Sequence, residues 1–199
     1  MKARLLIQLI GLCIFITLFS CSNTMQLTYT KPPAAPSIKG QIYVSIDDLR
    51  PPDRGGKDPF KVGFVRNAFG QPFPVKAAPD REPSKVVKEL ISVCLMSAGY
   101  KVVDDSSAAP HLRAQLKVFW SDGYQHSRMG LRMPIELRKS KKSIGVWAYE
   151  LDVNTGFTVR SAGYKQFNSG YNKMLEVAKE KLVEQFKRTE FQSHYLALQ

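Results

Sequence analysis

The sequence predicts an α+β fold with two layers, a mainly antiparallel sheet covered on one face by two helices. Apolar and polar residues alternate over 112–120 and 128–138, which is typical of strands with one buried face. Apolar residues recur at three-and-four spacing over 83–98 and 171–186, which indicates helices. With 199 residues, of which 44% are hydrophobic, the chain can bury a core and is too apolar for a disordered protein.

The first 20 residues have the pattern of an export signal. Lys2 and Arg4 precede an apolar run from Leu5 to Phe19. This run is shorter than the roughly 20 residues that a membrane-spanning helix needs, and it matches the apolar part of a signal peptide. The segment Leu18-Phe19-Ser20-Cys21 follows, and it resembles the lipobox of bacterial lipoproteins. An ordinary signal peptide with an incidental cysteine and an uncleaved anchor helix are the alternatives.

The lipobox resemblance implies removal of residues 1–20 and acylation of Cys21. A thiol can carry a thioether-linked lipid, and several acyl chains such as palmitate anchor stably where one is marginal. Ser22 stands where an aspartate would direct retention in the inner membrane. The resemblance therefore implies a lipid anchor in the outer membrane, on its periplasmic face.

Residues 21–40 are expected to form a flexible tether after the lipidated cysteine. Ser, Thr, Asn and Gln are frequent there, and Pro32, Pro33 and Pro36 favour an extended chain. The folded domain is expected to span residues 41–199.

The elements of this domain follow from local patterns. Strands are expected at 42–46, 61–65, around Val75 and at 101–103, with a loop over 47–57 and turns through 81. A helix is expected to begin at Pro83 and to end at Gly99, because proline suits a first turn and glycine a helix end. Beyond the two alternating strands, we expect a strand over 143–153, a turn at 154–156, its partner over 157–167, the closing helix and a short last helix near 190–198.

No group of residues in the sequence indicates an enzyme or a metal cofactor. His111, His126 and His194 lack metal-ligand spacing, and no serine lies in a nucleophile-elbow context. Asp47-Asp48 and Asp104-Asp105 are adjacent pairs followed by loop residues, which fits turns and strand ends. Cys94 lies in an apolar stretch and is expected to be a small buried side chain.

Positive charge is the pronounced feature of the composition. The net charge is +12, and removal of Lys2 and Arg4 leaves 27 basic and 17 acidic residues. Export argues against nucleic acid as the partner, so anionic lipids or glycopolymers of the envelope are the natural polyanions. The candidate contacts with an anionic surface are Arg128, Arg132, Arg138, Lys139, Lys141 and Lys142. The alternative interpretation is that these basic residues belong to a solvated hairpin turn.

The lipobox, the Ala98-Gly99-Tyr100 helix end, the strands from Leu112 to Phe167 and the closing helix from Tyr171 together resemble the YajG-like family of uncharacterised bacterial lipoproteins. They are also similar to envelope domains such as the amino-terminal domain of TolB. This resemblance implies an outer-membrane lipoprotein and transfers no catalytic residue.

We therefore expect a non-enzymatic, membrane-anchored lipoprotein that acts as a binding or scaffold component of an envelope complex, with an envelope protein as partner. The alternative is an auxiliary lipoprotein for lipid or lipopolysaccharide transport, which requires an apolar groove that can hold acyl chains.

Overall fold

The computed structural model describes residues 24–66, 70–105, 107, 110–123, 126–141, 143–158 and 164–199. The expected signal peptide and the lipidated Cys21 lie outside these residues. No helix in the described part is both long and apolar enough to cross a membrane.

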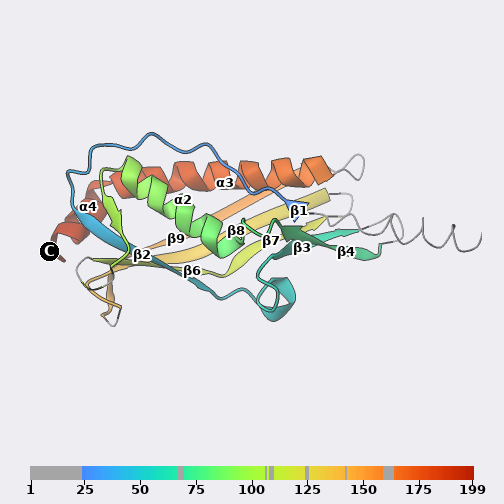
Figure 1. The fold of residues 1–199 in the computed structure, drawn as a ribbon, viewed down its shortest axis with the longest axis horizontal. Coiled ribbons are helices and arrows are strands. Elements are labelled where there is room, and N and C mark those ends of the chain that lie inside the picture. Colours follow the sequence, from blue (N-terminus) through green and yellow to red (C-terminus); the bar gives the residue numbers. More distant parts are fainter. Residues whose placement is uncertain are drawn as a thin grey trace, which may run out of the picture.

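A long hairpin links the two parts of a nine-stranded, curled sheet (Figure 1). Strand β8 pairs with β9 along its whole length, and the other edge of β8 pairs with β7 and then with β6. Strands β2 and β5 extend the sheet beyond β6, whereas β3, β4 and β1 extend it beyond β7. The strands are β1 (Thr24–Met25), β2 (Gln41–Asp48), β3 (Lys61–Arg66), β4 (Pro72–Ala77), β5 (Lys101–Val103), β6 (His111–Leu116), β7 (Val118–Gly123), β8 (His126–Arg138) and β9 (Gly145–Thr158).

The directions of the strands differ from the mainly antiparallel sheet that the sequence predicts. Four of the eight pairings among the described strands are parallel: β1 with β4, β2 with β5, β2 with β6 and β3 with β7. After β2 and β3 the chain passes through a helix and comes back to the end of the sheet at which those two strands begin. Strands β5, β6 and β7 therefore run parallel to β2 and β3. Alternation identifies a strand but carries no information about the direction of its neighbour.

Three helices pack on one face of the sheet (Figure 1). They are α2 (Pro83–Ser97), α3 (Tyr164–Lys187) and α4 (Thr189–Leu196), so the expected layer of two helices is joined by the short last helix expected near 190–198. Helix α2 begins with proline as predicted, and Gly99 follows it at a φ of 92°. A 3₁₀ turn, η1 (Pro52–Arg54), lies in the loop after β2.

The core fills the interface between helices and sheet. Its side chains include Val44 of β2, Leu131 of β8, Leu90 of α2 and Leu175 of α3, all with 0% exposure. Tyr171 of α3 is also buried, where its ring stacks on Phe119 at 5.5 Å and its hydroxyl donates to Ser121 Oγ at 2.7 Å. Because the buried hydroxyl is hydrogen-bonded, its burial lowers the stability of the fold only slightly.

Strand β9 continues through the Asn154-Thr155-Gly156 segment that the sequence predicts as a turn. Gly156 pairs with Arg128, and the strand ends only at Thr158. The expected hairpin partner over 157–167 is therefore wrong, since helix α3 already begins at Tyr164. Pairing with the full length of β8 outweighs the local turn propensity of these residues.

Residues 24–40 pack along the domain and do not form the expected flexible tether. Met25 and Leu27 are fully buried, and β1 adds two residues to the sheet beside β4. Further along, the amide N–H of Ala35 donates to Met96 O and that of Lys39 to Gly99 O. We call residues 24–40 the strap.

Helix α3 holds the first part of the strap through its side chains. The amide N–H of Gln26 donates to Asn168 Oδ1 at 2.8 Å, and that of Thr28 donates to Asn172 Oδ1 at 2.9 Å. The amide N–H of Thr30 donates to Glu176 in the same way. Every second residue of an extended chain thus meets every fourth residue of a helix, because both steps are about 6 to 7 Å long.

The loop after β2 is organised by a buried arginine. The Arg50 side chain has 0% exposure and donates to the Asp48 carboxylate at 2.7 Å. It also donates to the carbonyl oxygens of Pro59 (2.9 Å) and Lys61 (3.0 Å), which ties the loop to the start of β3. The loop expected from the sequence is therefore an ordered link between β2 and β3.

Candidate functional site

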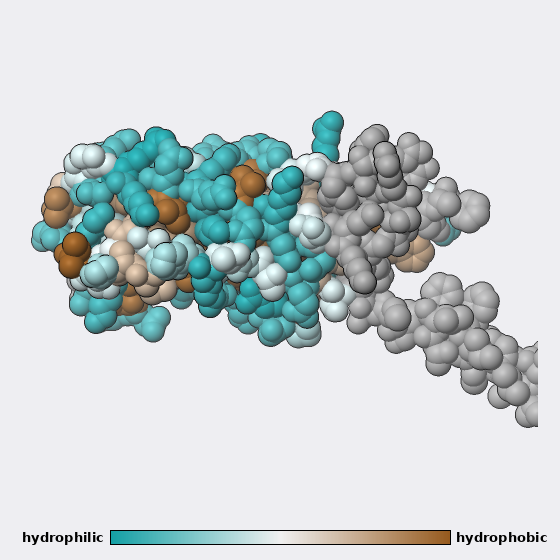
Figure 2. All heavy atoms as spheres, turned by 90° about the horizontal axis from the view of Figure 1, so that it is seen from above, coloured by the Kyte–Doolittle hydropathy of each residue, from teal (hydrophilic) through white to brown (hydrophobic). Residues whose placement is uncertain are grey.

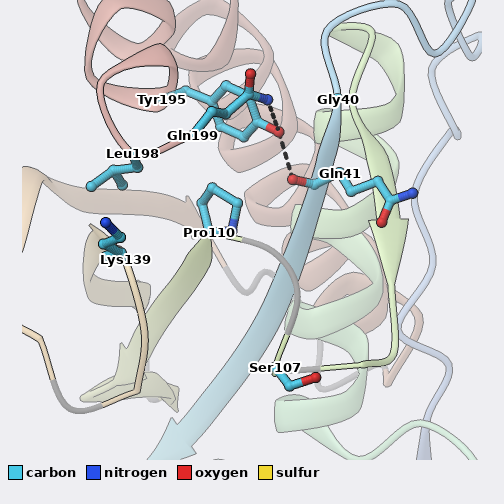
Figure 3. Close-up of a pocket in the computed structure, with 8 residues that line it drawn as sticks. All are labelled: Gly40, Gln41, Ser107, Pro110, Lys139, Tyr195, Leu198 and Gln199. Carbon is cyan, nitrogen blue, oxygen red and sulfur yellow. Dashed lines mark hydrogen bonds between the residues drawn. The ribbon is translucent and has the colours of Figure 1, made fainter.

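A cavity of about 530 Å³ opens at one end of the molecule, between α4, the start of β2 and the β8–β9 turn (Figure 3). It is lined by Gly40, Gln41, Ser107, Pro110, Lys139, Tyr195, Leu198 and Gln199. We call this end of the molecule the pocket end. Strands β1, β3 and β4 lie at the opposite end (Figure 1).

Tyr195 and Gly40 fix one wall of the cavity. The Tyr195 hydroxyl donates to Gln41 O at 2.6 Å, and Gln199 Nε2 donates to the same hydroxyl at 3.1 Å (Figure 3). Gly40 has a φ of 118°, and a Cβ atom there would lie 2.5 Å from the Tyr195 oxygen. The close approach of α4 to β2 therefore requires glycine at this position.

A cluster of buried aromatic rings supports the same wall. Tyr100 packs against Tyr195 at 4.9 Å and against Phe191 at 5.6 Å between ring centroids. Trp147 of β9 meets Phe191 edge to face at 4.8 Å. Such edge-to-face contacts between large rings make a rigid base for the surface above them.

Exposed apolar side chains also lie at the pocket end. Ile144 is 90% exposed and Val146 43% exposed, both just after the β8–β9 turn. Ile38 and Leu196 are also exposed, and each lies within two residues of a residue that lines the cavity. Figure 2 shows hydrophobic residues among hydrophilic ones at this end. Large exposed aliphatic groups beside a hollow are a common feature of interaction sites.

Two of the predicted basic residues extend from the same end. Lys139 and Lys141 are exposed, and Lys139 lines the cavity. The Lys141 ammonium lies 5.4 Å from the centre of the Tyr43 ring, a cation–π contact. Arg138 forms an ion pair with Glu136, which neutralises its charge locally. Lys142 lies outside the described residues.

Arg128 and Arg132 do not join this group. Arg132 pairs with Asp152 at 2.9 Å and with Glu150 at 3.8 Å, both on β9. Arg128 is exposed near the beginning of β8, and the ten residue-to-residue steps from Arg128 to Arg138 span about 33 Å of strand. The structure therefore separates the predicted basic surface into two ends and an ion-paired middle.

His111 is the titratable group buried beside the basic turn. It is 2% exposed, and its Nε2 atom lies 2.6 Å from Ser45 Oγ. Burial lowers the pKa of His111 first, and the positive charges of Lys141, Arg138 and Arg113 lower it further, while Asp47 opposes them. The described residues provide no hydrogen-bond partner for its Nδ1 atom. Sequence patterns alone do not identify this buried histidine, because it begins a strand after a loop.

The other candidates for chemistry have structural roles. Burial raises the pKa of the Cys94 thiol to about 12, so the thiolate that reacts with electrophiles is scarce at neutral pH. Asp47 pairs with Arg113 at 2.5 Å, and Asp105 accepts the amide N–H of Ser107 at 2.8 Å. Within the described ranges, no three His, Cys, Asp or Glu residues come together as a metal site would require.

The fold resembles that of solved bacterial proteins. A Xanthomonas campestris protein of the family DUF330 superposes with a TM-score of 0.58 at 14% identity, covering 88% of this chain and 98% of the other. A minor lipoprotein from Acinetobacter baumannii gives a TM-score of 0.43 at 6% identity, covering 74% of this chain and 91% of the other. No family model and no curated protein matches the sequence. The expected membership of the YajG-like family is therefore not confirmed.

Proposed function

We propose that this protein is a lipid-anchored, non-enzymatic component of the bacterial outer membrane that binds an envelope partner with its pocket end. Cys21 carries the acyl chains, and the domain faces the periplasm. The observation that carries the proposal is the gathering of exposed Ile144, the basic residues Lys139 and Lys141 and an open cavity at one end of the fold.

The surface chemistry favours a protein partner. Separated aliphatic groups with lysines between them suit a surface that offers apolar patches and carboxylates. The packed aromatic rings under the cavity hold its Tyr195 wall in place before binding, which lowers the entropy cost of association. Anionic glycopolymers would use the lysines but not the aliphatic side chains.

A carrier role for lipid or lipopolysaccharide finds less support in the geometry. Acyl chains need an apolar groove, and the interface between helices and sheet is filled by side chains such as Leu90, Leu131 and Leu175. The cavity at the pocket end has polar lining residues, among them Gln41, Lys139 and Gln199. An acyl chain could enter the core only after the helices had moved away from the sheet.

Membrane fractionation tests the anchor. Replacing Cys21 with Ala is expected to move the protein from the outer-membrane fraction to the soluble periplasmic fraction, because the acylated thiol is lost. Cys94→Ala is the matched control and is expected to stay in the membrane fraction. Retention of the Cys21→Ala protein in the outer membrane would overturn the anchoring claim.

Photocrosslinking in cells tests the binding surface. A photoreactive residue at Ile144 is expected to capture an envelope protein, and one at Leu49, which is 51% exposed outside the pocket end, is not. Lys139→Glu with Lys141→Glu should reduce the capture at position 144, since it reverses the charge around it. Equal capture at both positions would contradict the proposed site. Capture at position 144 that is unchanged by the two lysine-to-glutamate substitutions would also contradict it.

A further inference from the structure

We infer that the β3–β4 end of the domain rests on the lipid headgroups of the membrane that holds the anchor, so that the pocket end points away from that membrane. This inference rests on the proposed acylation of Cys21. It concerns the orientation of the domain and a contact surface for lipid, which the proposed function leaves open.

The short distance along the chain is the first argument. Only Ser22 and Asn23 separate Cys21 from Thr24, where β1 begins. Three residues of chain span at most about 11 Å even when fully extended. The strap does not add to this reach, because Met25 and Leu27 are buried in the core. A lipid on Cys21 therefore holds the start of β1 close to the membrane surface.

The direction of β1 is the second argument. β1 runs parallel to β4, with Thr24 opposite Lys76 and Met25 opposite Ala77. The amino end of β1 thus faces the same end of the sheet as Pro72, the first residue of β4. Phe73 lies three residues before Lys76, about 10 Å along the strand. The amino end of β1 is therefore directed toward the end of the domain at which β4 begins (Figure 1).

The surface at this end suits the interface of a bilayer. Phe73 is 38% exposed and stands between the exposed residues Pro72 and Pro74. Across the sheet, Phe73 is in register with Val65, which is paired with Gly123 on β7. Gly123 in turn pairs with Ser127 of β8, and the next residue of β8, Arg128, is exposed. An exposed aromatic ring and, three strands away at the same end of the sheet, an exposed arginine fit the apolar and anionic layers of the headgroup region.

The length of the sheet separates the two ends. From Ser127, opposite Gly123, to Arg138 at the pocket end, β8 covers about 36 Å. The headgroup region of one leaflet is only about 5 to 8 Å thick. With the β3–β4 end on the membrane, Lys139 and Ile144 lie beyond the headgroups of that leaflet. The pocket end then meets proteins or polymers of the periplasm and does not meet lipids of its own membrane.

Quenching of a fluorescent label by lipids tests this orientation. Acylated full-length protein carrying Cys94→Ala and either Phe73→Cys or Val146→Cys is labelled with bimane. Phe73 and Val146 are matched in exposure, at 38% and 43%. The proteins are placed in vesicles of phosphatidylethanolamine and phosphatidylglycerol that carry nitroxide groups at the headgroup. Labelled proteins that also carry Cys21→Ala give the background without an anchor.

The label at position 73 is expected to be quenched at least about twofold more than the label at position 146, because about 36 Å separate the two ends. Equal quenching would mean that the domain lies flat on the membrane, and stronger quenching at 146 that it is inverted; either result overturns the inference. Flotation of the vesicles is measured first. Protein that does not float with the vesicles would show instead that the proposed anchor is wrong.

Discussion

His111 shows how one buried side chain can make the stability of this domain depend on pH. The imidazole lies between Ser45 and the ring of Tyr43, and Lys141, Arg138 and Arg113 place positive charge around it. Burial and these charges favour the neutral form, so the pKa of His111 in the folded protein lies below its ordinary value. Protonation at this site is therefore easier in the unfolded chain than in the fold.

The free energy of unfolding is expected to fall as the pH drops below about 6.5, the pKa of an unfolded histidine, and to stop falling from this cause below the pKa of the folded form. Each unit by which the pKa is lowered contributes about 1.4 kcal/mol. In His111→Gln this contribution disappears, because glutamine does not titrate. Urea unfolding at pH 7 and pH 5 measures the difference.

His194→Gln on α4 is the matched control for this experiment, since it removes a half-exposed histidine that lies outside the His111 cluster. The wild type and the control are expected to lose more stability between pH 7 and pH 5 than His111→Gln loses. An equal loss in all three proteins would show that the acid sensitivity arises from other groups.

The strap is the element for which the structure differs most from the sequence prediction, because it is packed on the domain and is not a free spacer. A proline-rich segment after an anchor is typical of a spacer, yet the structure places Leu27 in the core with 0% exposure. Leu27→Ala is expected to lower the free energy of unfolding by about 2 to 5 kcal/mol, as for other leucines removed from a packed core. Denaturant unfolding of the two proteins measures the change.

Ile38→Ala is the control for the strap, because Ile38 belongs to the same segment and is 83% exposed. Its loss should change the stability by less than about 0.5 kcal/mol. A Leu27→Ala protein as stable as the control would mean that the strap contributes nothing to the folded domain.

Elements with a strong local pattern could be predicted from the sequence, and elements that depend on distant partners could not. Helix α2 has the expected position because its periodicity reports its own burial. The single strand expected over 112–120 is wrong, because the chain divides at Lys117 into β6 and β7, which pair with different parts of β8. The continuation of β9 through Gly156 depends on pairing with Arg128, which no local pattern contains. The packing of the strap on the domain could not be predicted, because buried and exposed residues alternate only over the short range 24–28. This range also contains polar residues that are common in linkers.

The basic site shows the same limit. The lysines of the β8–β9 turn are recognisable as a charged turn, and the structure places Lys139 beside a cavity. The ion pair of Arg132 with Asp152 depends on the register of β9, and the distance from Arg128 to Arg138 depends on the unbroken length of β8. The exposed aliphatic side chains at the pocket end come from three separate parts of the sequence, so only the fold brings them to one end of the molecule.

At the scale of the whole molecule, the β8–β9 hairpin joins the two parts of the sheet. Strand β8 contacts β7 with its first half and β6 with its second half, so neither part has a complete edge without it. Helix α3 packs on β8 and β9 over the same length (Figure 1). We therefore expect the domain to unfold in one cooperative transition.

Two tryptophans report on the two parts separately. Trp120 lies on β7 beside Phe64 of β3, and Trp147 lies on β9 beside Phe191 of α4. Fluorescence of the single-tryptophan proteins Trp147→Phe and Trp120→Phe is expected to give the same unfolding midpoint as circular dichroism measured on the same protein. Midpoints that differ between the two probes within one protein would show that the halves unfold independently.

The strap also determines how the domain would respond to a pull on the lipid that we propose for Cys21. The pulling force would enter at Thr24 and run along β1, which lies parallel to β4, so the hydrogen bonds between these strands would be loaded together in shear. The side chains of Asn168 and Asn172 would share the load along α3. Freeing the anchor from the domain would require drawing Met25 and Leu27 out of the core. With the proposed acylation of Cys21, the lipid and the domain would therefore form one mechanical unit.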